Sequence, residues 1–194
     1  DLEFTPRYSP QSLGAVGQMQ RATQEQLRAL RTDVEIRYGN IVITPDWVIW
    51  PWLVRHSMWT LERFKVHANG MTSYEANFGL AYKGDLVPIA ETCLFRFSVS
   101  KQGRGAKGVS LGKADLRFLK AIFLGRAEDT NEYLAGTPAG VYYSRTLKRL
   151  PDGERADVAL LGMLQGVPWN TLDTKPKGRK ALAAPGPILQ PAVV

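Results

Sequence analysis

The chain has 194 residues, of which 44% are hydrophobic and 22% charged, so it can fold as one sizeable domain or two small ones. A single cysteine, Cys93, and two histidines exclude an internal disulfide framework and a cysteine-cluster zinc site. No apolar run approaches the roughly 18 residues of a membrane span, so we expect no membrane partner. The chain opens on Asp1, and we interpret it as a piece of a longer polypeptide or a processed product.

The net charge of +7 is concentrated in the second half of the chain. Residues 1–95 contain 9 Lys and Arg against 10 Asp and Glu, whereas residues 96–194 contain 16 against 8. Residues 96–126 alone carry eight cations and one acid, Asp115. This imbalance favours an anionic polymer as partner, and a basic surface that contacts only solvent is the alternative.

Three helices are predicted in the first part of the chain. The first covers residues 15–31, where helical spacing places on one stripe Val16, Met19, Leu27 and Leu30. The second covers residues 51–64, and its expected buried stripe is Leu53, Val54, Met58, Leu61 and Phe64. The third, at 73–78, is predicted from Thr72 and Glu75, whose spacing is that of a capping box.

The pattern then changes to short strands. Alternating apolar residues predict a strand over 93–99, and further strands are expected near 118–124, 133–134 and 141–147. Beyond residue 151 the chain carries little periodic signal, and we predict a linker or disordered tail over 151–194. Helices followed by strands predict an α+β fold.

The first segment contains a motif. Residues 8–21 read YSPQSLGAVGQMQR, and the residues that carry the pattern are Tyr8, Pro10, Gln11, Ser12, Gly14 and Arg21. This passage resembles the end of the catalytic core of retroviral and retrotransposon integrases, where a flexible loop leads into a long helix.

Three further passages resemble the same family. Residues 52–64, with WLVRHS and LERF, and residues 70–91, with GMTSYE, look like passages of Copia-type elements. FLG at 123–125, followed by GV at 140–141 and RT at 145–146, looks like the small β region that follows the core. The blocks occur in the family's order over about residues 5–150, which makes the resemblance specific.

The resemblance implies phosphoryl transfer by an Asp-Asp-Glu triad that holds two Mg²⁺ ions. The position that matches the family's Glu is Gly17, which offers no ligand. Glu25 lies two turns further on, roughly 12 Å along a helix, and cannot replace it. No residue matches the two aspartates, which we expect upstream of Asp1. We therefore assign no catalytic residue and no metal ligand, and expect no strand transfer by this chain.

Contacts with DNA do not require the triad. The resemblance places against DNA a loop and a polar helix face that carry Tyr8, Gln11, Ser12, Gln18, Arg21 and Gln24. A second candidate is the Gly-rich loop with Lys101, Arg104 and Lys107, which could follow a phosphate backbone. The alternatives are a solvated helix face and a surface loop. For His56 we favour a packing or capping role.

Together these features predict an α+β fold in three parts. Residues 1–85 would be the C-terminal helical part of a ribonuclease-H-like integrase core, 86–150 a small basic antiparallel β module, and 151–194 the tail. Because this core would lack its sheet, we expect an exposed Trp and Leu face that self-associates or contacts the rest of a polyprotein.

The function expected is that of a retrotransposon integrase segment, catalytically incomplete and binding DNA. The alternatives are a non-catalytic basic nucleic-acid-binding module, and an inert remnant or protein-interaction piece of a transposable element. A nuclear location follows from the family alone, and a cytoplasmic one is the alternative.

Overall fold

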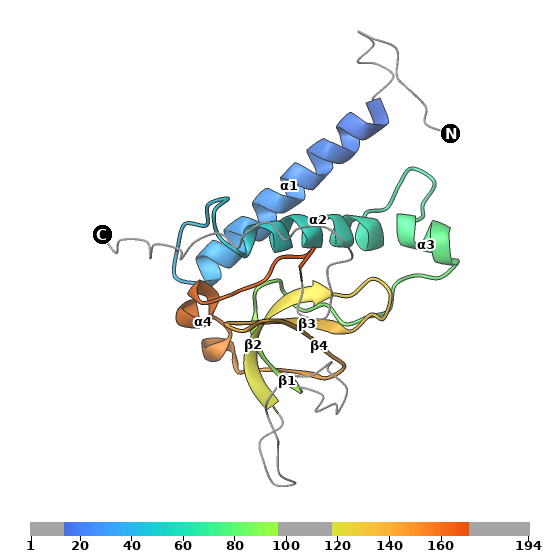
Figure 1. Cartoon of the computed structure of the whole chain (residues 1–194). Coiled ribbons are helices and arrows are strands. Elements are labelled where there is room, and N and C mark those ends of the chain that lie inside the picture. Colours follow the sequence, from blue (N-terminus) through green and yellow to red (C-terminus); the bar gives the residue numbers. More distant parts are fainter. Residues whose placement is uncertain (1–13, 97–117, 171–194) are drawn as a thin grey trace.

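The computed structural model describes residues 14–96 and 118–170 and shows a mixed α+β fold (Figure 1). Helices α1 (Gly14–Arg37), α2 (Trp50–Phe64) and α3 (Ser73–Phe78) come first. Strands β1 (Thr92–Arg96), β2 (Phe118–Arg126), β3 (Tyr133–Thr137), β4 (Gly140–Ser144) and β5 (Leu147–Arg149) follow. The 3-10 helix η2 (Asp152–Glu154) and helix α4 (Val158–Gly162) come last. The predicted order of helices and then strands is confirmed.

The strands form one antiparallel sheet with the order β4-β3-β2-β1-β5. Strands β1 to β4 form a meander, and β5 returns to the free edge of β1. The predicted strand over 141–147 is divided in two, because pairing with β3 ends at Ser144 and residues 145–146 belong to neither β4 nor β5. Ser144 Oγ donates to the Arg96 carbonyl at 2.8 Å, which ties this corner to the end of β1.

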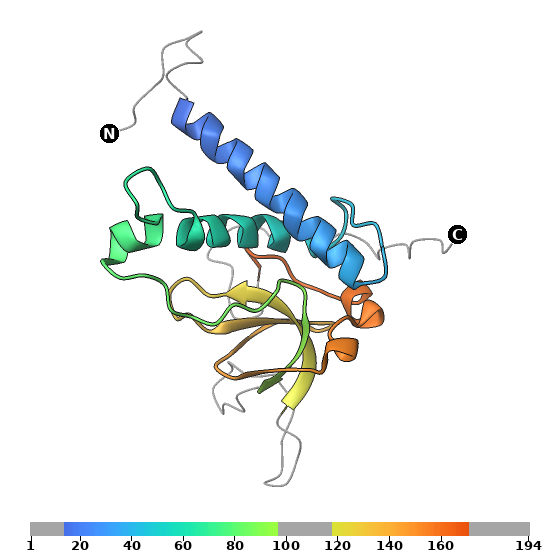
Figure 2. The ribbon, with the colours of Figure 1, turned by 180° about the vertical axis from the view of Figure 1, so that it is seen from behind.

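Helix α2 packs between α1 and the sheet, as both views of the ribbon show (Figures 1 and 2). Trp52 and Leu53 of α2 are fully buried in one core with Ile122 and Leu124 of β2. The expectation of an exposed Trp and Leu face is therefore wrong. The predicted buried stripe of α2 is right only at Leu53, since Met58 and Phe64 are exposed and the buried side of the helix is Trp52, Leu53, His56, Ser57 and Trp59. The β-sheet of this same chain covers that side.

Helix α1 extends further than predicted at its C-terminal end, and the apolar side chains of its first turns are exposed. It continues to Arg37 because Val34 is buried in the core, as is Tyr38 just beyond it. At the other end the predicted stripe is not covered, since Val16 is 62% and Met19 41% exposed. The first turns of α1 consequently extend beyond the rest of the molecule (Figure 2).

Residues 151–170, expected to belong to the linker or tail, have regular structure. Asp157 caps α4 by accepting a hydrogen bond from the Leu160 amide at 2.9 Å. Leu161 and Leu164 are buried in the main core. A helix of five residues shows no periodicity that a sequence pattern could reveal, which explains the difference.

Candidate nucleic-acid interface

Three of the predicted DNA-binding residues lie on α1. Gln18, Arg21 and Gln24 are exposed and three residues apart, so they follow the side of the projecting helix. Arg28 extends the same row by one further turn and is also exposed. The other six predicted residues lie outside the described part of the chain: Tyr8, Gln11, Ser12, Lys101, Arg104 and Lys107.

Gly17 lies on this projecting part of α1 and faces open space. Among the residues that the structure describes, a Cβ atom built at Gly17 would have no atom within 4 Å other than those of its own helix. A glutamate side chain could therefore be placed there without a steric clash. The glycine is not required by close packing in this structure.

A second cationic surface lies on the sheet, and the sequence analysis did not identify it. Leu94 of β1 is flanked by Lys120 of β2 and Lys148 of β5, which pair with it from either side. Arg96 pairs with Phe118 on the same face, because residues two apart on a strand point the same way. We call the set Arg96, Phe118, Lys120 and Lys148 the basic sheet face.

The basic sheet face combines exposed charge with an aromatic ring. Arg96, Lys120 and Lys148 are exposed, and the Lys148 ammonium lies 4.8 Å from the centre of the Phe118 ring. Glu154 approaches Lys120 at 3.9 Å, a distance that leaves the ammonium accessible to another anion. Strand register creates this surface, because Lys120 and Lys148, 28 positions apart in the sequence, both pair with Leu94.

The connection 97–117 leaves β1 at Arg96 and enters β2 at Phe118, so it joins the basic sheet face at both ends. The predicted loop residues Lys101, Arg104 and Lys107 belong to this connection. The start of α1 lies at the opposite end of the molecule (Figure 1). The structure therefore holds two separate candidate surfaces.

His56 has a packing role. Its ring stacks on Trp59 at 5.3 Å and meets the edge of Phe123 at 6.2 Å. Its Nδ1 atom is buried with no hydrogen-bond partner among the described residues. Burial, and secondarily the charge of Arg55, lowers the pKa of His56 to about 4, so the ring is neutral at pH 7.

Acidification is therefore expected to destabilise the fold. The His56 pKa is 6.5 in a model peptide and about 4 in the folded chain, so the unfolded chain binds more protons between these values. We expect the free energy of unfolding to fall by about 3 kcal/mol as pH drops from 7 to 4. Chemical denaturation of His56→Phe, compared with the exposed-histidine variant His67→Phe, checks this: only His56→Phe should lose that part of the pH dependence.

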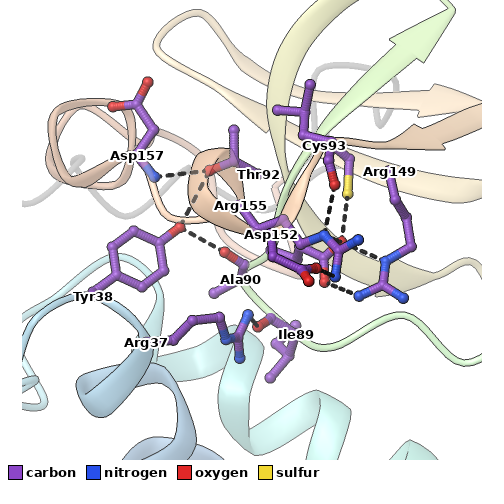
Figure 3. A network of polar contacts seen from close by, with 12 residues as sticks. Arg37, Tyr38, Ile89, Ala90, Thr92, Cys93, Arg149, Asp152, Arg155 and Asp157 are labelled. Atoms are coloured by element: carbon purple, nitrogen blue, oxygen red, sulfur yellow. Dashed lines mark hydrogen bonds and ion pairs between the residues drawn. The ribbon is translucent and has the colours of Figure 1, made fainter.

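Glu91 is buried and contacts Cys93, Arg149 and Arg155, which Figure 3 labels. Its carboxylate accepts two hydrogen bonds from Arg149, both at 2.6 Å, and Arg155 lies 3.7 Å away. Cys93 points to the same carboxylate, and burial followed by the charge of Glu91 raises the pKa of this thiol to about 12. A paired carboxylate and a protonated thiol are suited to holding strands together and not to catalysis.

Neighbouring contacts in Figure 3 connect the helices to β1 and to the segment just before it. The Tyr38 hydroxyl donates to the Ala90 carbonyl at 2.6 Å, and Arg37 donates to the Ile89 carbonyl at 3.0 Å. The Asp157 amide donates to the Thr92 hydroxyl at 3.1 Å. These bonds join α1, β1 and the start of α4, so the network stabilises the junction of helices and sheet.

The magnesium site that the resemblance implies does not fit the described residues. Within residues 14–96 and 118–170, no group of three or more His, Cys, Asp and Glu side chains could hold a metal ion. Gly17 supplies no side-chain oxygen at the position of the family's Glu.

No helix in the part of the chain that the structure describes is long and apolar enough to cross a bilayer.

Comparison with known proteins adds no relative: no family model, curated protein or solved structure matches the chain.

Proposed function

We propose that the chain is a segment of a retrotransposon-type integrase that binds DNA without catalysing strand transfer. Within the α+β class, the fold that we propose is the C-terminal helical part of a ribonuclease-H-like core followed by a small β module. The ordered sequence blocks over about residues 5–150 support it, as does the exposed polar side of α1. The proposed partners are DNA and the rest of a polyprotein, and the proposed location is nuclear.

The observation that carries DNA binding is the basic sheet face. Three exposed cations lie on adjacent strands beside an aromatic ring, and no ion pair among the described residues occupies Arg96 or Lys148. Lysine and arginine neutralise backbone phosphates without reading base edges, so this surface suits binding without sequence preference. Two separate surfaces also allow contacts with two segments of DNA.

Affinity for a DNA duplex across a salt series tests the proposal. Each phosphate contact contributes about 0.9 to the slope of log K against log salt. The double variant Lys120→Met/Lys148→Met should therefore lose about 1.8 from the slope, and Arg21→Met about 0.9. Lys65→Met, an exposed lysine on neither surface, is the matched control and should change nothing. Equal slopes for all four proteins would contradict DNA binding through these surfaces.

The same experiment distinguishes the second candidate, a basic nucleic-acid-binding module unrelated to integration. The basic sheet face alone favours it. If Arg21→Met leaves DNA affinity unchanged while Lys120→Met/Lys148→Met weakens it, a basic nucleic-acid-binding module is the better explanation. Gly17→Glu tests the ancestry of α1, because a restored carboxylate should make DNA binding depend on Mg²⁺ in an integrase-derived chain.

A further inference from the structure

A polar hollow of about 450 Å³ lies away from both candidate surfaces. Its walls are the turn between β2 and β3 and the segment 83–85 that follows α3. The charged side chains that line it are Lys83, Asp85, Arg126, Glu132 and Arg145. None of the residues of the basic sheet face and none from α1 takes part, so the hollow needs its own explanation.

Arg126 is the buried cation of this hollow, with only 6% of the residue exposed. Its guanidinium donates to the carbonyls of Asn131 at 3.1 Å and Asp85 at 3.3 Å, and to the Tyr133 hydroxyl at 3.1 Å. It also lies over the Tyr133 ring, 4.2 Å from its centre. The guanidinium is therefore held in one position before any ligand arrives.

Two buried donors have no partner among the described residues: Nε of Arg126, which lines the hollow, and the hydroxyl of Tyr82, which does not line it. Burial raises the pKa of Tyr82, and the charge of Arg126 partly offsets that rise, so the two groups act on each other. Buried donors are satisfied in nearly all proteins, and leaving one unpaired is costly. An acceptor in the hollow that reached Arg126 Nε would remove that cost at the arginine.

The backbone is shaped to bring these groups together. Gly125 has a φ of +112°, and the β2–β3 register shifts between Phe123 and Arg126, which turns the arginine toward the hollow. A Cβ atom at Gly84 would lie 2.2 Å from the Tyr82 hydroxyl oxygen. A larger residue at position 84 would therefore displace the Tyr82 ring end, so glycine lets the wall of the hollow pass directly over that hydroxyl.

Charge selects the type of ligand. Lys83, Arg126 and Arg145 outnumber the two carboxylates of the hollow. Arg145 and Glu132 neutralise each other, because the Glu132 carboxylate accepts from Arg145 at 2.9 Å and also from the Thr130 hydroxyl at 3.3 Å. Lys83 and Arg126 then remain against Asp85, which leaves one positive charge in excess. Fixed donors with a positive balance favour an oxyanion with several acceptor oxygens.

We propose that the hollow between the β2–β3 turn and residues 83–85 binds a phosphate group, held by Arg126 with Lys83 at the entrance. The phosphate could be free or part of a nucleic-acid backbone, since both present the same oxygens. The proposal does not depend on the integrase assignment.

Titration of the whole chain with inorganic phosphate, followed by NMR, tests the site. We expect saturable shifts of the Lys83, Gly84 and Asn131 amides and of the Arg126 Nε–H. Arg126→Met should abolish them. Because that variant removes three internal hydrogen bonds, Lys83→Glu provides a second test at an exposed position and should weaken the affinity by at least about tenfold.

Lys65→Glu is the matched control, since it makes the same charge change at an exposed lysine outside the hollow. Equal phosphate affinity in the two glutamate variants would overturn the proposal, as would identical shifts with chloride at the same ionic strength. A DNA duplex added to the phosphate-saturated chain then identifies the source. Displacement of phosphate assigns the site to a nucleic-acid backbone, and retention assigns it to free phosphate.

Discussion

Replacing Arg149 with methionine is expected to lower the free energy of unfolding by about 4 kcal/mol. Glu91 is 1% exposed, and both of its carboxylate oxygens depend on Arg149 for their shortest hydrogen bonds. Without Arg149 the carboxylate stays buried, with Arg155 no closer than 3.7 Å. A buried charge that loses its main partner is far more costly than an exposed one. Chemical denaturation measures the loss.

Replacing the other partner of this ion pair should lower the free energy of unfolding by less. Glu91→Gln removes the buried charge, and the side chain of Arg149, 41% exposed, can turn to solvent. We expect a loss of about 2 kcal/mol, the usual scale for leaving buried polar groups poorly paired. The double variant should then be more stable than Arg149→Met alone, because no buried carboxylate remains.

Lys148→Met is the control for this pair of variants. Lys148 is the adjacent residue of β5 and points to the opposite, exposed face of the sheet. It should change the unfolding free energy by no more than about 0.5 kcal/mol. If the Lys148 and Arg149 variants lose equal stability, β5 is sensitive to any substitution and the ion pair is not what stabilises this edge.

The first three helices and most strands could be predicted because their local patterns are long enough. Thr72 and Glu75 form the predicted capping box, with Glu75 Oε2 accepting from the Thr72 amide at 2.8 Å. In β1 the predicted alternation is confirmed at Cys93 and Phe95, which are both fully buried, whereas Arg96 is exposed. Each of these features is decided within a few residues.

Features that depend on distant neighbours could not be predicted. The stripe of α2 shows that Leu53 must be covered, but not that β2 covers it. Lys120 and Lys148 become a single surface only through the register of β2 and β5 on β1. Glu91 gave no sign of its two arginine partners, because Arg149 and Arg155 lie about 60 residues further along the chain. Contacts between residues far apart in the chain decide all three.

Trp52→Ala should be as damaging as Arg149→Met, lowering the free energy of unfolding by about 4 kcal/mol. Trp52 is fully buried between α2 and the sheet, and its indole N–H donates to the Gly166 carbonyl at 3.0 Å. Trp52→Phe should cost less, since it keeps part of the ring volume and loses the hydrogen bond. Trp169→Ala is the control, because that side chain is 69% exposed.

Hydrogen exchange of Trp52→Ala also tests whether residues 1–85 and 86–150 are separate units. Trp52 and Leu53 share one core cluster with Ile122 and Leu134, so loss of the indole should lower the protection of α2 and β2 amides together. If α1 and α2 lose protection while β2 and β3 keep theirs, the sheet is stable alone and the helices are an attached unit. If helices and strands lose protection together, the sheet of this chain completes the core of the helices. It then takes the place of the sheet that the resemblance assigns to a larger polypeptide.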